Sequence, residues 1–437
     1  MKVLLVGAGG REHALAWRLR RDIPNVEIVA APGNPGIAEL AKCVPVGGTD
    51  VDALLEVARS ESVDWTLVGP EAPLAAGVAD AFQANRLPLF GPTRAAAMLE
   101  TSKAFSKTLM VQAGLPTARA VACSTVAEAR RAIDELGAPV VVKASGLAAG
   151  KGVIVCPTAA DAYATATAML EENAFGDAGA TVLVEEYMEG EELSLFVLTD
   201  GERVVPLPPA QDHKRLLDGD RGPNTGGMGA YCPVAIAERS PHLVDSVLDR
   251  VARPTLDAMR ARGTPFTGLL YVGLMLTTDG PKVVEFNCRF GDPETQAVLP
   301  ALGQNSVSEL MFTIARGDRI PDGIRFTTSR SAVTTVLAAP GYPEKPRTGD
   351  RITIPATPDN VLVFHAGTKR VGDGSLVTAG GRVLGITGLG GSLDEAQARS
   401  QEFAADVSFA GKQFRTDIGW RELAPSGANA TKGAGAP

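Results

Sequence analysis

Three polar side chains of different chemistry stand two residues apart near the end of an apolar segment: Glu285, Asn287 and Arg289. Successive side chains of a β-strand point to opposite faces, so the three would share one face if the strand continues to residue 289. A carboxylate and an amide oxygen bind Mg²⁺, and a guanidinium binds phosphate. The apolar neighbours imply burial, and an unpartnered buried carboxylate is costly. We therefore interpret Glu285 and Asn287 as metal ligands rather than as part of a solvated strand face.

A glycine-rich segment at 143–152 lies between two apolar runs. It lacks the order GxxxxGK[ST], so it is not a Walker loop. Its small residues would let the backbone close over a polyphosphate, with Lys143 and Lys151 supplying positive charge on both sides. Taken alone, such a segment is more often a turn with two solvated lysines. The polar pattern at 285–289 shifts the balance toward phosphate binding.

Two acidic stretches allow more than one interpretation. Glu185, Glu186 and Tyr187 end one apolar run, and Glu192 begins the next. Acidic residues at a strand end most often face water. Alternatively, backbone groups at 186 and 188 bind an adenine edge while Glu192 accepts hydrogen bonds from ribose hydroxyls. The residues alone do not decide between these interpretations.

A polar, glycine-containing cluster occupies 211–215 and 224–229 and shows little periodicity. A long loop of this kind is usually either functional or disordered. His213 has no identifiable Ser or Cys nucleophile as a partner, so we expect it to position its neighbours rather than to act as a catalytic base.

The elements that must position these residues fall into three parts. From 1 to about 90, short β-rich runs alternate with helical stretches, which predicts a doubly wound parallel sheet. From about 106 to 328, further strands follow, and Asp279-Gly280 between two apolar runs predicts a hairpin that carries the site. From 331 onward, β-rich runs precede an amphipathic helix at 393–407, which indicates a small α+β cap. Residues 425–437 are small and polar, typical of a disordered tail.

The first turn of the chain, 7–13, resembles a dinucleotide-binding fingerprint, but Glu12 replaces the third glycine of GxGxxG. A nicotinamide dinucleotide is therefore disfavoured. Two interpretations stay equal: a strand-to-helix turn that binds a single phosphate with Arg11 beside it, and a plain tight turn.

Composition excludes several classes of protein. Apolar residues make up 45% and charged residues 21% of the 437 residues, as in ordinary multidomain globular proteins. The net charge is −8 without a basic run, which argues against nucleic acid as a partner. The five cysteines include no CxxC pair, and no apolar run reaches the ~18 residues of a membrane span. We expect a cytoplasmic protein with no membrane partner.

Eleven segments in order along the chain resemble those of the phosphoribosylamine–glycine ligase family of ATP-grasp enzymes. They are GGREHAL (9–15), APGNPG (31–36), VGPEAPL (68–74), SKAFSK (102–107), KASGLAAGKGV (143–153), NAFGDAG (173–179), QDHKR (211–215), GPNTGGMGAY (222–231), EFNCRFGDPETQ (285–296), FHAGT (364–368) and DIGW (417–420). Each glycine motif alone is weak, but the ordered set is very specific and spans nearly the whole chain.

The resemblance implies an architecture and an activity. It implies an N-terminal α/β domain at 1–105, an ATP-grasp domain at 106–328 with a lid at about 123–196, and a C-terminal cap at 329–424. The implied reaction is the ATP-dependent ligation of glycine to 5-phosphoribosylamine through glycyl phosphate, giving glycinamide ribonucleotide, ADP and phosphate in purine biosynthesis. The enzyme would use Mg²⁺ or Mn²⁺ and act as a monomer or weak homo-oligomer.

The resemblance also implies roles for individual residues. For ATP they are Lys103, Lys143, Gly146, Gly150, Lys151, Gly152, Glu185, Glu186, Tyr187 and Glu192. For glycine and phosphoribosylamine they are Gly9, Gly10, Pro70, Glu71, Asp212, Lys214, Asn224, Thr225, Gly226, Gly227 and Met228. Glu285 and Asn287 would bind the metal, and Arg289, Lys143, Lys151 and Asp212 would be catalytic.

The sequence departs from related patterns at two places. Ser145 stands where these ligases usually have Asp, although biotin carboxylases, which share the fold, look similar to this chain there. The strand at 269–276 lacks a carboxylate that those carboxylases would lead one to expect, which leaves a second metal ion open. The rival functions are another ATP-grasp ligase such as a carboxylase, an NAD-linked dehydrogenase, and a nucleotide sensor without catalysis.

Overall fold

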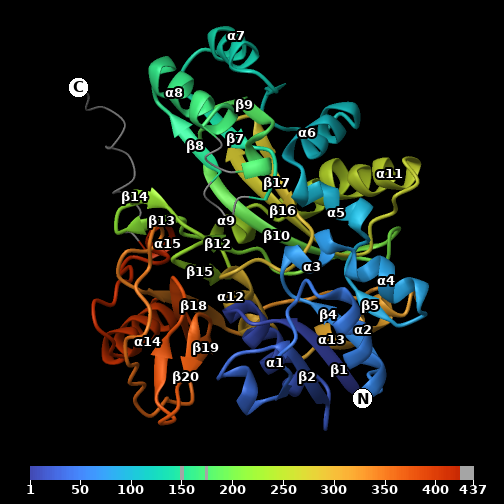
Figure 1. Cartoon of the computed structure of the whole chain (residues 1–437), viewed down its shortest axis with the longest axis vertical. Coiled ribbons are helices and arrows are strands. Elements are labelled where there is room, and N and C mark those ends of the chain that lie inside the picture. The colour runs from blue at the N-terminus through green and yellow to red at the C-terminus, as the bar shows by residue number, and fades with distance from the viewer. Residues whose placement is uncertain (148–151, 173–175, 424–437) are drawn as a thin grey trace.

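The first 90 residues form the parallel sheet that their alternating pattern predicts (Figure 1). The strand order is β3-β2-β1-β4-β5, with β1 (Lys2–Gly7), β2 (Glu27–Pro32), β3 (Lys42–Cys43), β4 (Trp65–Val68) and β5 (Leu89–Phe90). The helices that alternate with these strands are α1 (Gly10–Asp22), α2 (Val51–Ser60), α3 (Glu71–Ala76) and α4 (Val78–Ala84). The computed structural model describes residues 1–147, 152–172 and 176–423.

Strand β1 is apolar on both faces because helices cover both sides of its sheet. Val3 and Leu5 belong to the same core as residues of α1 and of α13 (Val307–Ala315), a helix from much later in the chain. Leu4 and Val6 belong to the core that includes α2 and α4. The N-terminal sheet is thus buried in part by the middle of the chain, so the two parts share one core.

A separate lobe, called the glycine-loop lobe, lies at the top of Figure 1 and contains the two strands that flank the glycine-rich segment. Its antiparallel sheet has the order β6-β9-β7-β8, formed by β6 (Ala120–Cys123), β9 (Val182–Glu186), β7 (Val140–Ala144) and β8 (Val153–Cys156). Helices α7 (Val126–Leu136) and α8 (Ala159–Leu170) pack on it and complete a core of its own. Within the expected lid range, Glu192 lies outside this lobe, on the central sheet.

The central sheet holds the predicted hairpin. Its order is β11-β10-β16-β17, formed by β11 (Val204–Pro206), β10 (Glu191–Thr199), β16 (Gly268–Thr277) and β17 (Gly280–Asn287). Gly280 begins β17 with φ +102°, a backbone conformation that suits glycine. Glu285 pairs with Gly273 and Val283 pairs with Leu274, which leaves Val284 as the extra residue of a bulge. Two helices, α5 (Arg94–Thr101) and α6 (Lys103–Gln112), contact β17.

The helical run at 243–261 has a wider turn in its middle. It comprises α10 (Leu243–Val247), a π-helical turn (Leu248–Ala252) and α11 (Arg253–Ala261). Pro254 follows the wide turn and lacks a backbone N–H, so it cannot donate the α-helical hydrogen bond to residue 250.

The C-terminal sheet takes strands from two distant parts of the chain. Its order is β12-β15-β18-β22-β19, with β12 (Gln211–Asp212), β15 (Gly229–Cys232), β18 (Ser331–Ala338), β22 (Arg382–Gly390) and β19 (Val361–His365). Helix α14 (Leu393–Asp406) and helix α12 (Glu294–Ala301) pack against it. The smaller elements are β13 (Arg215–Leu217), β14 (Arg221–Asn224), α9 (Ala235–Arg239), β20 (Thr368–Arg370), β21 (Leu376–Thr378) and α15 (Trp420–Leu423). Because β12 and β15 flank the 213–228 loop, the cap and this loop form one structural unit.

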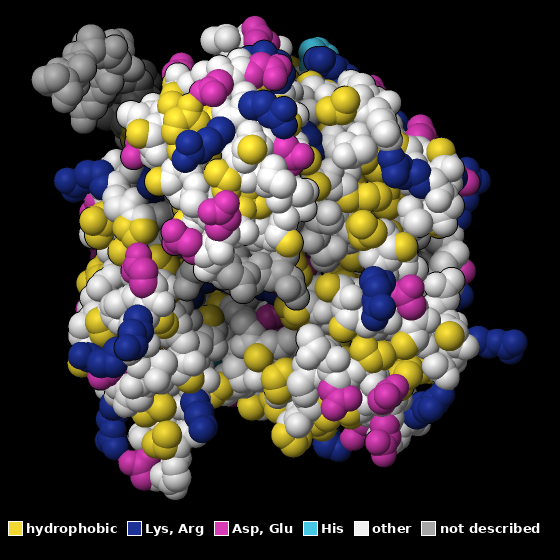
Figure 2. Space-filling view, turned by 45° about the horizontal axis from the view of Figure 1, so that its top comes forward, with side chains coloured by type: hydrophobic (Ala, Val, Ile, Leu, Met, Phe, Trp, Pro, Cys, Tyr) yellow, Lys and Arg dark blue, Asp and Glu magenta, His cyan; other side chains and the backbone are white. Residues whose placement is uncertain are grey.

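Across the described ranges, no helix combines the length and apolar character that crossing a membrane requires. Figure 2 shows one face of the molecule hollowed between the glycine-loop lobe and the N- and C-terminal lobes.

Candidate active site

A cavity of about 370 Å³ is lined by residues of the N-terminal lobe, the glycine-loop lobe, the central hairpin and the cap. The predicted site residues in its lining are Pro70, Glu71, Lys103, Lys143, Gly152, Glu185, Asp212, Lys214, Thr225, Gly226, Glu285, Asn287 and Arg289. The hairpin edge at 285–289 and the segment that begins at 143 therefore meet at one cavity. Strict alternation of side chains along the strand predicts only part of the lining, because Val284 and Phe286 also line the cavity.

Glu285 is the free carboxylate of the hairpin. It lines the cavity, and none of the described residues forms a hydrogen bond or ion pair with it. Burial opposes its charge, but the ammonium groups of Lys214, Lys143 and Lys103 hold the pKa of Glu285 below its ordinary value. The carboxylate is therefore ionised at neutral pH and available to a cation.

Lys103, Lys107 and Lys143 form the lysine group, two members of which pair with another carboxylate of the lining, Glu185. Lys143 Nζ lies 2.7 Å and Lys107 Nζ lies 3.2 Å from the two oxygens of Glu185. Lys103 Nζ donates to the carbonyl of Gly146 at 3.2 Å. Burial lowers the pKa of Lys103 and Lys107, while Glu185 counteracts it for both. Positive charge is thus concentrated where the glycine-rich segment begins.

Three arginines, Arg11, Arg289 and Arg382, line another part of the cavity and are called the arginine group. Arg289 lies between two carboxylates, with Nη2 at 2.8 Å from Glu100 and Nε at 3.2 Å from Glu71. Burial opposes ionisation of Glu71, yet Arg289 and Arg11 hold its pKa below the ordinary value. The backbone N–H of Cys288 donates to the second oxygen of Glu100 at 2.8 Å. The guanidinium is consequently fixed in orientation.

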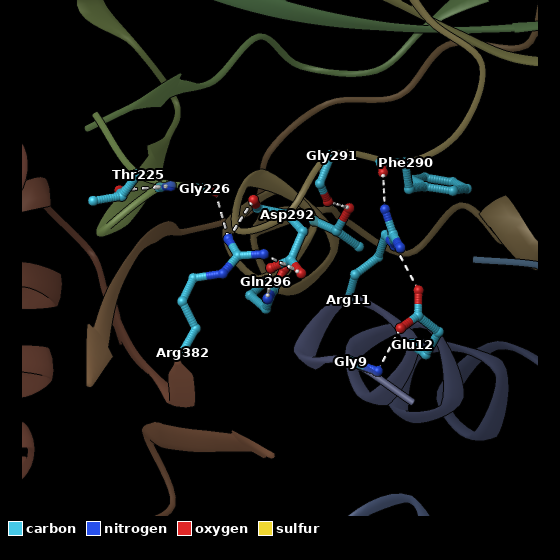
Figure 3. A network of polar contacts seen from close by, with 12 residues as sticks. Gly9, Arg11, Glu12, Thr225, Gly226, Phe290, Gly291, Asp292, Gln296 and Arg382 are labelled. Carbon is cyan, nitrogen blue, oxygen red and sulfur yellow. Dashed lines mark hydrogen bonds and ion pairs between the residues drawn. The ribbon is translucent and has the colours of Figure 1, made fainter. Parts of the chain in front are cut away.

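The other two arginines belong to a network that joins the N-terminal lobe, the central segment and the cap (Figure 3). Arg382, on β22, donates to the carbonyl of Gly226 at 2.5 Å and pairs with the Asp292 carboxylate at 2.9 Å. Arg11, on α1, pairs with Glu12 at 2.5 Å and donates to the carbonyl of Phe290 at 3.0 Å. The cap thereby holds two loops of the cavity wall in register.

Asp212 and Lys214 face a cluster of polar groups at the same cavity. Burial raises the pKa of Asp212 to about 7, with Lys214 opposing the rise and the nearby carboxylates, Glu294 foremost, adding to it. Lys214 pairs with Glu192. Tyr271 donates to Glu294 at 2.5 Å, also in the lining. This part of the cavity offers both an ammonium group and carboxylates to a small zwitterionic ligand.

Several predicted residues lie outside the lining of this cavity. They are Gly9, Gly10, Gly146, Glu186, Tyr187, Glu192, Asn224, Gly227 and Met228, while Gly150 and Lys151 lie outside the described residues. Glu186 pairs with Arg119 at 2.8 Å, and Tyr187 is exposed.

The first turn is filled by the side chain of Glu12. Its carboxylate accepts a hydrogen bond from the backbone N–H of Gly9 at 2.5 Å. A Cβ atom at Gly7 or Gly69 would lie within 2.5 Å of Glu12 side-chain atoms. The residue that breaks the dinucleotide fingerprint therefore occupies the anion position at the start of α1.

Other lining residues were not assigned a role from the sequence: Glu100, Lys107, Tyr271, Asp292, Glu294 and Arg382. Lys107 stands four residues after Lys103, the spacing that places two side chains on one helix face, and this signal could have identified it. Arg382 lies 90 residues beyond Asp292 on a cap strand, and nothing local in the sequence connects the two.

The residues fit one divalent cation that shares its ligands with phosphates. Within the described ranges, no three His, Cys, Asp or Glu side chains gather to hold a metal ion by themselves. Glu285 and Asn287 supply a carboxylate and an amide group, and Mg²⁺ usually takes one or two carboxylates together with phosphate oxygens and water. The ionised, unpartnered state of Glu285 agrees with that use. Gly273, opposite Glu285 on β16, has no side chain that could add a ligand.

Comparison with solved structures defines the class of the fold. The chain superposes with a TM-score of 0.70 on a biotin carboxylase from Campylobacter jejuni, at 16% identity over 95% of this chain and 93% of that one. Residues 101–295 match the family profile described as "Phosphoribosylglycinamide synthetase, ATP-grasp (A) domain". The fold is that of the ATP-grasp enzymes.

The family within that class follows from closer relatives. Residues 1–100 and 332–421 match the N and C domains of the same synthetase family. Phosphoribosylamine–glycine ligases of Xylella fastidiosa (strain 9a5c) and Escherichia coli O6:H1 are 48% and 47% identical, each covering 97% of this chain and 97% and 99% of the relative. The crystal structure of the Thermotoga maritima ligase superposes with a TM-score of 0.83 at 33% identity, covering 96% of this chain and 100% of that one. This chain belongs to the phosphoribosylamine–glycine ligase family.

Proposed function

We propose that the chain joins glycine to 5-phosphoribosylamine through glycyl phosphate, with conversion of ATP to ADP and phosphate, in the cytoplasm and as a monomer or weak homo-oligomer. The observation that carries the proposal is the meeting of the lysine group, Glu285 and the arginine group at one cavity. A triphosphate, a carboxylate and an amine can then be held together, which is what the reaction of this family requires.

The lysine group is the proposed site of the ATP phosphates. Lys103 and Lys143 are ammonium groups at the start of the glycine-rich segment, and Gly152 lets the backbone approach closely. Gly150 and Lys151 belong to the same proposal on sequence grounds. Adenosine would lie beside the end of β9, with backbone groups near Glu186 and Tyr187 at the adenine. Glu192 would then hold the ribose.

Glu285 and Asn287 would hold Mg²⁺ or Mn²⁺. The bound cation would offset negative charge on the phosphates during transfer. Arg289 acts on the same charge from the protein side. Its fork is fixed by Glu71 and Glu100, so the guanidinium is already oriented when the glycine carboxylate attacks the γ-phosphorus.

Glycine and phosphoribosylamine would occupy the wall formed by Asp212, Lys214 and the 224–228 loop. The carboxylate of Asp212 attracts an amine, and the ammonium of Lys214 attracts a carboxylate or phosphate. The amine of phosphoribosylamine attacks the carbonyl of glycyl phosphate and phosphate leaves, without a covalent enzyme intermediate. Orientation supplies most of the rate, because a well-placed amine reacts as if at very high concentration.

Phosphate release from ATP tests the proposal. We expect release only when glycine and phosphoribosylamine are both present, with each substrate alone as the control. Release that depends on bicarbonate and biotin would contradict the assignment, and binding of ATP without release under any combination would indicate a sensor. Formation of glycinamide ribonucleotide, followed by mass spectrometry, identifies the product.

A further inference from the structure

A small hairpin projects from the substrate wall, and its base carries two residues of the cavity lining. Strands β13 and β14 pair with each other, with Arg215 opposite Asn224. Directly below that pair, the backbone N–H and the hydroxyl of Thr225 donate to the carbonyl of Lys214 at 2.8 and 2.7 Å. Any shift of the hairpin would therefore move Lys214 and Thr225 together.

The segment at 415–421, which contains the DIGW motif, contacts this hairpin through a fully buried arginine. The side chain of Arg415 is 0% exposed. Its Nη1 pairs with Asp220 at 2.7 Å and donates to the carbonyl of Arg215 at 3.2 Å. Nε and Nη2 bind the two carboxylate oxygens of Asp417 at 2.7 and 2.8 Å. One guanidinium thus connects the first strand and the turn of the hairpin with the end of the cap.

The tip of the hairpin is held by separate contacts. The backbone N–H of Gly219 donates to Asp417 at 2.8 Å. Thr416 donates to the two carboxylate oxygens of Asp218, from its N–H at 2.9 Å and from its hydroxyl at 2.6 Å. Asp220 has φ +54°, an unusual conformation for a residue with a side chain, which such contacts can stabilise.

A third set of contacts reaches the strands that flank the loop. The backbone N–H of Gly419 donates to Nε2 of buried His213 at 2.9 Å, next to Lys214 in the chain. Ile418 fills the space beside Gly229, where a Cβ atom would lie 2.6 Å from its Cδ1. None of the residues 415–421 lines the cavity itself.

We propose that the segment 415–421 is a clamp that sets the position of Lys214 and Thr225 in the substrate wall, with Arg415 as its principal positioning residue for glycine and phosphoribosylamine. This inference rests on the proposed function, because it assigns those substrates to this wall. The clamp acts on the carboxylate and amine substrates and leaves the lysine group, which belongs to other elements, unaffected.

The test replaces Arg415 by lysine and compares it with an equally buried arginine elsewhere. Arg415→Lys keeps the charge but loses the planar fork that binds Asp220 and Asp417. Arg18→Lys is the matched control, because Arg18 is 1% exposed and binds Leu299 and Asn305 carbonyls away from the cavity. We expect Arg415→Lys to raise KM for glycine and phosphoribosylamine about 10-fold, with KM for ATP changed less than about 2-fold. Arg18→Lys should lower the melting temperature without moving any KM.

The exposed tip provides a second variant if Arg415→Lys does not fold. Asp218→Asn weakens the contact with Thr416 and leaves the buried arginine in place, and we expect a smaller rise in the same two KM values. Equal substrate KM values in these variants and in Arg18→Lys would overturn the clamp. Absence of ligase activity in the unaltered protein would instead overturn the proposed function, so the two failures are distinguishable.

Discussion

The lysine group and the arginine group hold positive charge at the same cavity in different ways. Lys143 and Lys107 share the single carboxylate of Glu185, at 2.7 and 3.2 Å. By contrast, Arg289 binds two carboxylates of its own and also donates to the carbonyl of Phe290 at 3.1 Å. The lysines come from α6 and from the glycine-loop lobe, whereas the arginines come from helix α1, the segment after β17 and the cap strand β22.

This difference indicates a division of work. An ammonium group is a compact point charge on a flexible stem, which can adjust to the position of a phosphate. A guanidinium bound on several sides is fixed in direction and can stabilise charge that develops at one place in the transition state. We therefore expect kcat to depend more on the orientation of the side chains in the arginine group and more on net charge in the lysine group.

The largest expected effect comes from Glu285, whose negative charge is favoured, without direct contact, by the positive charges of Lys214, Lys143, Lys103 and Arg289. Glu285→Gln keeps the shape but removes the charge that a divalent cation requires, so we expect kcat to fall by more than about 100-fold. The folded structure should persist, because no partner within the described residues is lost. Turnover at varied Mg²⁺ and thermal unfolding measure the two effects.

Asp279→Asn is the control for that variant, since Asp279 lies at the exposed turn of the same hairpin. It should leave kcat unchanged. Near-normal turnover of Glu285→Gln at low Mg²⁺ would mean that the cation binds elsewhere. The lysine group and the arginine group would then not act together at Glu285.

A pair of charge-conserving exchanges tests the comparison directly. Arg289→Lys removes the fork between Glu71 and Glu100, and we expect kcat to fall roughly 100-fold. Lys143→Arg retains a cation beside Glu185, and we expect a loss nearer to about 10-fold. Single-turnover phosphate release separates chemistry from binding in both variants. If Lys143→Arg proves the more damaging exchange, the proposed division between direction and charge is wrong.

Much of the fold was predictable because its signals are local. The alternation of strands and helices predicted the N-terminal parallel sheet, and Asp279-Gly280 predicted the hairpin of β16 and β17. The C-terminal sheet was not fully predictable. Its strands β12 and β15 come from about 100 residues or more before β18, and the short run at 211–212 carries no periodicity that could indicate its partner.

The site residues show the same contrast: those with a local sequence signal were predictable, and those without one were not. Glu285, Asn287 and Arg289 were found because their spacing is a strand signal within five residues. Glu100 and Arg382 were missed because each acts through a partner far along the chain, Arg289 and Asp292. A bulge at Val284 also changes which side chains face the cavity, and no residue type marks that bulge in advance.

The smallest expected effect concerns Glu186 and tests whether the charged region around the lysine group extends beyond Glu185. Glu186 follows Glu185 in the chain, but its carboxylate pairs with Arg119 at 2.8 Å, and the side chain of Arg119 is 69% exposed. Exposed ion pairs contribute about 0 to 1 kcal/mol to the free energy of unfolding, so Glu186→Gln should change the melting temperature little. If Glu186 contributes to adenosine binding through its backbone, KM for ATP should stay within about 2-fold, a change of about 0.4 kcal/mol. A rise of 10-fold or more would show that the carboxylate itself contacts the nucleotide, and the charged region around the phosphates would then extend past Glu185 to the end of β9.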